Sequence, residues 1–408
     1  MKIPKQLPKG EFQAFVTGAI NQVASASKIV LIGNFALNYI LSGSLNEIWS
    51  AINAQQLIIM MPLCDVSLPA NVLDFFGKIF EIAAFDIYPN LGENIDWLLN
   101  LEPTEPMTKG FEELGFESVY ILNNMGTMSI FFISYPALIL LQKVLQRCKG
   151  GSKRTARVNQ SLKRSLYYSS LVKGIYEGFS VIAVGVLIGL YHIRFDSYGT
   201  SLQSGACILF TIVLTGVPCL IIWHAERHFT RLSDEGMLKF YGSLFSELRL
   251  ESGRAVLLEP AFFMCRRFIV AFAIVVCRHI LIVQVYLIWA QTTIAVYIIG
   301  FVDPYTSKAK AVIEIFNELT IISVLYTIIC LSDFVPEEET KVQVGNFACA
   351  IVSLHLVVSI SRIMRTSILD SRRSRRFKKA FAKLQEERKI NKERLIKSNR
   401  LRKKQREE

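Results

Sequence analysis

Long apolar stretches separated by short charged loops recur along most of this chain of 408 residues. Inside a lipid bilayer the backbone must satisfy its hydrogen bonds within each segment, so a crossing helix needs about 20 mostly apolar residues. The composition agrees with this requirement, because 51% of the residues are hydrophobic. The pattern therefore predicts an all-α fold, a polytopic transmembrane helical bundle.

About nine apolar stretches have the length and composition of membrane spans. The second contains several polar residues and is broken by Pro62, so a re-entrant or interfacial helix is the alternative for it. The candidate spans are 24–42, 46–64, 120–143, 174–193, 203–223, 262–278, 280–300, 313–332 and 343–362.

Positive charge is concentrated in two segments beside these spans. Segment 143–164 carries eight basic residues and no acidic residue, and the tail from Arg362 onward is strongly basic as well. Loops rich in lysine and arginine stay in the cytosol, and an even number of predicted spans separates these two. We therefore expect both to be cytosolic, together with loop 224–261. The net charge of +12 then indicates contact with anionic lipid rather than nucleic acid.

Acidic residues dominate the loops expected on the opposite side. Segment 65–119 is strongly acidic and should form a small extracellular cap, in which 68–85 has the apolar spacing of an amphipathic helix. The chain then divides into a transmembrane domain at 1–363 and a basic cytosolic helix at 364–408. The N-terminus lies outside if 46–64 crosses the membrane, and inside if it does not.

Three stretches carry a resemblance to a known family: 42-SGSLNEIWSAINAQQLIIMMPL-63, 264-MCRRFIV-270 and 303-DPYTSKAKAVIEIFNELTIISVLYTIICLSDFVPEEET-340. Together they resemble the C-terminal transmembrane region of transient-receptor-potential-like (TRP-like) membrane proteins of ciliates. A more distant similarity is to the fungal group of flavin-carrier and polycystin-like proteins. The resemblance implies nine spans, an extracellular N-terminus and a channel-like function.

Polar residues at the cytosolic ends of the last spans are the first candidates for a functional site. Glu314 and Glu318 are four residues apart and share one face of a helix. Charged groups inside spans are costly, so they line an ion pathway or form structural ion pairs with nearby basic residues. Both interpretations are open for Glu314, Asn317 and Glu318, and the possible basic partners include Arg266, Arg267 and Arg362. For Arg266 and Arg267 we expect side chains that extend to lipid phosphates, and the alternatives are binding of an inositol lipid or an ion pair with Glu318. Glu177 is expected to form a local pair with Lys173 at the membrane interface.

Two further groups of charged residues are candidates. The outer loop between the last two spans is either an acidic ring that attracts cations or a solvated turn. Its candidate residues are Asp333, Glu337, Glu338 and Glu339. The start of the basic tail is expected to bind anionic lipid through Arg372, Arg373, Arg375, Arg376, Lys378 and Lys379.

Sequence motifs of catalysis do not appear. The chain contains no Walker loop, no GxSxG and no HExxH, and its five histidines show no complete set of metal ligands. We therefore predict that it is not an enzyme and that it has no cofactor and no metal site.

Three functions fit these observations. The first is a cation channel or channel-like subunit, the second a carrier of a small molecule or lipid, and the third a non-conducting scaffold or receptor. The expected partners are the bilayer, anionic lipids at its cytosolic face and further copies of the chain in a homo-oligomer. The expected location is the plasma membrane.

Overall fold

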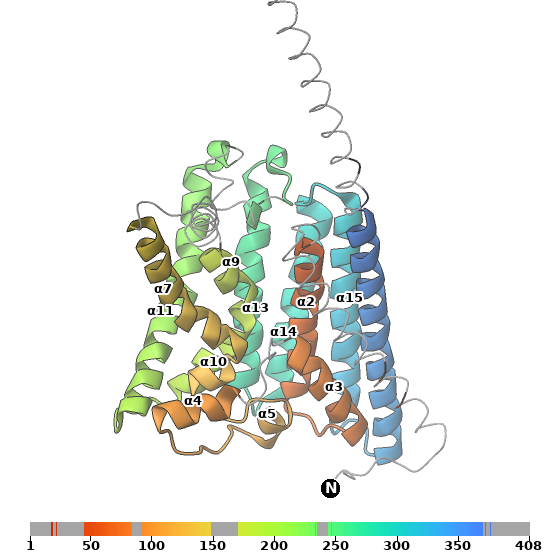
Figure 1. Ribbon diagram of the computed structural model, residues 1–408. Coiled ribbons are helices and arrows are strands. Elements are labelled where there is room, and N and C mark those ends of the chain that lie inside the picture. The colour runs from red at the N-terminus through yellow and green to blue at the C-terminus, as the bar shows by residue number, and fades with distance from the viewer. Residues whose placement is uncertain are drawn as a thin grey trace, which may run out of the picture.

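The computed structural model describes residues 18, 22, 45–83, 91–147, 170–232, 234, 244–245, 247–369, 372 and 376. These residues are almost entirely helical (Figure 1). The α-helices are α2 (Leu45–Met60), α3 (Ala70–Ala83), α4 (Leu91–Leu99), α5 (Lys109–Glu113), α6 (Ile121–Asn124), α7 (Thr127–Arg147), α9 (Ser170–Glu177), α10 (Phe179–Leu190), α11 (Tyr198–Arg227), α13 (Leu258–Val275), α14 (Leu281–Tyr297), α15 (Lys308–Cys330) and a final helix, Glu338–Leu369. Short 3₁₀ turns lie at Met61–Leu63, Phe229–Arg231, Leu250–Ser252 and Arg254–Leu257, and a π-helical turn at Ile298–Val302 extends α14.

Five described helices are long and apolar enough to cross a membrane, which makes the chain a multi-pass membrane protein. They are Met128–Arg147, Tyr198–Arg227, Leu281–Val302, Lys308–Cys330 and Glu338–Leu369. Each overlaps one of the predicted spans. The predicted spans 46–64, 174–193 and 262–278 are also helical, but their helices are shorter or more charged. The predicted span 24–42 lies outside the described residues.

The predicted span 174–193 is divided into α9 and α10 at Gly178. The twelve residues of α10 rise only about 18 Å, whereas the hydrocarbon core of a bilayer is about 30 Å thick. Residues 179–189 of α10 are all buried, and this helix packs against α11 and α13. A helix that is apolar on every side is suited to such a central position.

Helices α2, α13 and α15 pack together on one side of the bundle, where α2 contacts both of the others. Figure 1 shows α2 between α13 and α15, with the final helix beside α15. These four helices contain 45–60 of the stretch 42–63, all of 264–270, and 308–330 and 338–340 of the stretch 303–340. Residues that lie far apart in the sequence therefore meet within one group of helices.

Helix α3 confirms the amphipathic pattern predicted for 68–85. Its apolar face is buried at Val72, Phe75, Phe76, Ile79 and Phe80. Two hydrogen bonds attach α3 to the final helix, because the amide nitrogen of Asn71 donates to Asn346 Oδ1 at 2.8 Å and to the carbonyl of Val342 at 3.3 Å. The cap is thus packed directly against the bundle.

Aromatic contacts join α3 to the rest of the cap. The rings of Phe80 and Phe116 meet edge to face at 5.1 Å, and Phe111 lies 5.8 Å from Phe116. Figure 1 shows α4 and α5 at the lower end of the bundle, whereas the connection between α11 and α13 lies at its upper end. This is the relative placement that the loop charges predict for 65–119 and 224–261.

Candidate functional site

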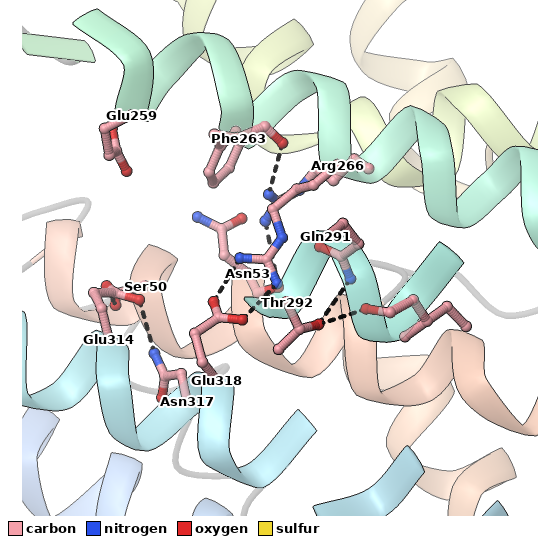
Figure 2. A network of polar contacts seen from close by, with 12 residues as sticks. Ser50, Asn53, Glu259, Phe263, Arg266, Gln291, Thr292, Glu314, Asn317 and Glu318 are labelled. Carbon is pink, nitrogen blue, oxygen red and sulfur yellow. Dashed lines mark hydrogen bonds and ion pairs between the residues drawn. The ribbon is translucent and has the colours of Figure 1, made fainter. Parts of the chain in front are cut away.

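A buried ion pair joins α13 to α15. The Arg266 guanidinium donates to both carboxylate oxygens of Glu318, with Nη1–Oε1 and Nη2–Oε2 distances of 2.5 and 2.9 Å (Figure 2). The two side chains are only 9% and 4% exposed. A bidentate ion pair of this kind fixes both the relative direction of α13 and α15 and the distance between them. The structural ion pair considered for Glu318 is therefore present in the fold.

The neighbouring Arg267 is also buried but has a different environment. Because both guanidinium groups are buried and bond to protein atoms, the prediction that they extend to lipid phosphates is wrong. The Arg267 guanidinium donates to the carbonyls of Phe263, at 3.2 Å, and Asn53, at 3.3 Å. It also lies 3.4 Å from the centre of the Phe263 ring, and the ring of Tyr176 stacks on Phe263 at 4.0 Å. The Arg267 guanidinium and the Tyr176 ring cannot lie on the same face of the Phe263 ring. Phe263 is therefore held between a cation on one face and an aromatic ring on the other.

Glu314 is the centre of a second set of polar contacts, in which three side chains donate to its carboxylate. Ser50 Oγ donates to Oε1 at 2.7 Å and Asn317 Nδ2 donates to Oε2 at 3.0 Å (Figure 2). Lys310 Nζ lies 2.9 Å from Oε1. Lys310 also contacts Glu247 at 3.2 Å. Glu314 therefore connects α2 with α15 and, through Lys310, with the loop that precedes α13.

A histidine of the final helix extends these contacts across the bundle. His355 is fully buried, and its two ring nitrogens contact Gln55 Nε2 at 2.7 Å and Asn317 Oδ1 at 2.9 Å. An amide nitrogen donates and an amide oxygen accepts, so these contacts fit a neutral ring with its proton on Nε2. Its ring also stacks on Phe316 at 5.5 Å. An unbroken chain of polar contacts runs from Gln55 through His355 and Asn317 to Glu314.

Glu177, predicted to pair with Lys173 at the membrane interface, has partners inside the bundle, whereas the side chain of Lys173 lies outside the described residues, so that pair stays a prediction. Glu177 is only 6% exposed and accepts a hydrogen bond from Asn53 Nδ2 at 2.9 Å. Its backbone carbonyl accepts a second bond, at 3.2 Å, from Gln56 Nε2. The physical reason is that α2 carries amides on the face toward α9, which gives the carboxylate a partner inside the bundle.

A cavity of about 120 Å³ lies among these residues. On its wall Glu259 accepts a hydrogen bond from the Tyr305 hydroxyl at 3.0 Å. Figure 2 shows Glu259, from α13, on the side of the site opposite Glu314, from α15. Among the described residues, five glutamates and three basic residues line the cavity. They are Glu177, Glu247, Glu259, Glu314 and Glu318 against Arg266, Arg267 and Lys310.

Two loops meet beside the cavity and form what we call the clasp, residues 247–249 and 303–306. Leu248 and Tyr305 form an isolated antiparallel bridge. The backbone nitrogens of Arg249 and Thr306 donate across it to Pro304 and Glu247, at 2.7 and 2.9 Å. An ion pair between Arg249 and Asp303, at 2.7 Å, adds a more exposed contact. Because Glu247, Leu248 and Tyr305 line the cavity, the clasp forms part of its wall.

The remaining predicted residues that the structure describes do not line this cavity. In the outer loop Asp333, Glu337 and Glu339 are exposed and Glu338 is half-buried, and Thr340 Oγ1 donates to Glu337 at 3.0 Å. Arg362 is half-buried in the final helix. Of the lipid patch, Arg372 and Arg376 are exposed, whereas Arg373, Arg375, Lys378 and Lys379 lie outside the described residues.

Several members of the site were not identified from the sequence: Ser50, Asn53, Gln55, Glu259, Tyr305 and His355. The signal that could have found some of them is polarity within an apolar run. The amides of α2 made 46–64 the least certain span, yet a polar residue in a span requires a protein partner. Among the described residues no group of three His, Cys, Asp or Glu side chains is arranged to hold a metal ion.

Comparison of the chain with protein-family models, with curated proteins and with solved structures found no match. The functional conclusion therefore comes from the site itself and from the resemblance of the three short stretches.

Proposed function

We propose that this multi-pass membrane protein is a TRP-like cation channel or channel subunit with nine spans in the plasma membrane. The observation that carries the proposal is the cavity among α2, α13 and α15, where the described carboxylates outnumber the described basic side chains. Charged residues are expensive inside a membrane and usually serve an ion or substrate pathway. An excess of carboxylates raises the local concentration of cations.

The three stretches that resemble the TRP-like family support the proposal, because each contributes to this site. Segment 42–63 supplies Ser50 and Asn53, segment 264–270 supplies Arg266 and Arg267, and segment 303–340 supplies Glu314, Asn317 and Glu318. In this proposal the upper end of the bundle in Figure 1 faces the cytosol. The cavity and the clasp then lie toward the cytosolic side, and the acidic cap and outer loop face outward.

A cation-flux measurement tests the proposal. The purified full chain, reconstituted in liposomes, should pass potassium or sodium above the rate of empty liposomes. Glu314→Gln should lower this flux several-fold, because it removes charge from the cavity and keeps the size of the side chain. The control is Glu251→Gln, which changes an exposed glutamate on the adjoining loop. A wild-type rate equal to that of empty liposomes would refute channel activity.

A carrier of a small molecule or lipid is the second candidate. The observation in its favour is that the cavity is small and that the clasp forms part of its wall, which fits a site that opens and closes around a solute. Solute uptake and lipid-scrambling assays on the same liposomes separate the two functions. Uptake or scrambling without cation flux would favour the carrier, and the absence of all three would favour a scaffold.

A further inference from the structure

We propose that the cavity binds a small primary amine that carries an oxygen acceptor, with the chemistry of ethanolamine, and that Glu259 is its counter-ion. The inference rests on the proposed function only because it places a ligand in the same cavity. Its evidence is a charge imbalance and a set of buried polar atoms that the protein leaves without hydrogen bonds.

The charge imbalance is located around Glu259 and Glu177. Arg266 is matched by Glu318, and Lys310 is matched by Glu314 and Glu247. Arg267 is the cation that remains beside Glu259 and Glu177, and the hydrogen bonds found for it go to backbone carbonyls, so one negative charge is left over among these three groups. The contact found for Glu259 is the neutral hydroxyl of Tyr305, which donates to Oε1. The described residues make no hydrogen bond to Oε2 of this carboxylate, which leaves it open to a ligand. A cationic ammonium group would supply the missing charge and also donate a hydrogen bond.

Unsatisfied atoms on other cavity residues fit the two ends of such a ligand. Among the described residues, none donates a hydrogen bond to the buried side-chain oxygen of Asn53, so this oxygen can receive a second N–H of the ammonium. Arg266 and Arg267 are 7% and 2% exposed, and the same residues offer no acceptor to the Nε–H of either. These two N–H groups need an acceptor, which the oxygen of the ligand would supply. A buried donor or acceptor left without a partner costs about 1–3 kcal/mol, so a ligand or ordered water is expected to satisfy them.

The cavity wall and volume narrow the ligand further. The described residues hold no group suited to a metal ion, and the wall contains aromatic rings beside its carboxylates, a combination that favours an organic ammonium. The volume of about 120 Å³ corresponds to about four water molecules at roughly 30 Å³ each. A free amino alcohol fits this volume. The same amine and oxygen also occur at the end of an ethanolamine phospholipid, whose head group would enter beside the clasp.

Titration calorimetry on the purified full chain in detergent tests the site, with ethanolamine as the ligand at constant ionic strength. We expect saturable binding. Propylamine, which lacks the oxygen, should bind several-fold more weakly, and potassium chloride should give no saturable heat. Glu259→Gln should weaken ethanolamine binding at least tenfold, because it removes the counter-ion and keeps an acceptor for Tyr305. Glu251→Gln, in the exposed loop nearby, should bind as the wild type does.

Thermal unfolding in nanodiscs distinguishes the two sources of the amine. If the lipid is the source, phosphatidylethanolamine should stabilise the wild type relative to phosphatidylcholine, and free ethanolamine should add nothing further. If the free amine is the source, it should stabilise the wild type equally in both lipids. Absence of saturable binding to the wild type, equal binding of potassium, or unchanged binding in folded Glu259→Gln would each overturn the site. Ethanolamine binding without cation flux would refute only the proposed channel, and flux without ethanolamine binding only this site.

Discussion

The two ends of the bundle are held together by different interactions. The cap is packed through phenylalanine rings, with Phe75, Phe76, Phe111 and Phe116 almost completely buried. At the other end the helices α2, α13 and α15 meet through charged and amide side chains. Apolar packing tolerates exchange of similar side chains, whereas a buried polar network loses much of its value when one member is removed. The difference indicates that the cap serves mainly stability and that specific chemistry belongs to the polar end.

The largest effect should come from breaking the buried ion pair. Glu318→Gln leaves the Arg266 charge without its partner, so the free energy of unfolding should fall by about 3–5 kcal/mol. Thermal or denaturant unfolding of the purified protein measures this loss. The double variant Arg266→Met/Glu318→Met removes both charges and should recover most of the stability. If the double variant were as unstable as the single one, the pair would not be the cause.

A moderate effect should follow from separating the cap from the final helix. A Cβ atom added at Gly345 would lie 2.6 Å from Val72 Cγ2, so Gly345→Ala should force α3 and the final helix apart. Overpacking of this kind costs about 1–3 kcal/mol. Thermal unfolding measures the cost, and cation flux should stay near the wild-type rate. The control is Gly205→Ala, since nothing lies within 4 Å of a Cβ atom there. Loss of flux in Gly345→Ala at preserved stability would contradict the division between the two ends.

A smaller effect is expected from the hydroxyl of Ser50. Ser50→Ala removes one of three donors to Glu314 and leaves Asn317 and Lys310 in place. Stability should decrease by about 1–2 kcal/mol, since the lost hydrogen bond is made to a charged group. A loss above that of Glu318→Gln, measured by the same unfolding method, would place the main support of this end at Glu314 instead of the ion pair.

The smallest effect should occur in an exposed ion pair of the cap. Lys78 and Asp74 lie 2.8 Å apart, one turn of α3 from each other, and their side chains are 41% and 43% exposed. Lys78→Ala should therefore change the unfolding free energy by no more than about 0.5 kcal/mol. The unfolding free energy of the Lys78→Ala variant should also depend little on salt concentration. A larger loss would show that charge contributes to the cap as it does to the opposite end.

Much of the fold could be predicted from the sequence, because membrane helices are encoded by local composition. Predicted spans 313–332 and 343–362 correspond to helices Lys308–Cys330 and Glu338–Leu369. The helices differ at their ends, since turns that extend beyond the apolar core have no hydropathy signal. The division at Gly178 was missed, because α9 and α10 together have the length and composition of one span.

The site was predictable only in part. Glu314 and Glu318 were identified because charge inside an apolar run is visible locally, and basic partners at similar depth could be named. The residues of α2 and the final helix that join this network could not be identified from the sequence. Ser50 is 264 residues from Glu314, and His355 is 300 residues from Gln55. Such contacts depend on how the helices are ordered around each other. Hydropathy contains no information about that order.

The contacts of His355 have a consequence for how the final helix can move. Both ring nitrogens are engaged, one by α2 and the other by α15. Sliding the helix by one turn, about 5.4 Å, would bring Ile351 or Ser359 to this position. Isoleucine offers no polar atom, and a serine hydroxyl is too short to reach both neighbours. His355 thus fixes the register of the final helix at one depth, as the bonds from Asn71 to Asn346 and Val342 do at another. A motion that keeps the His355 contacts would tilt or rotate the three helices together.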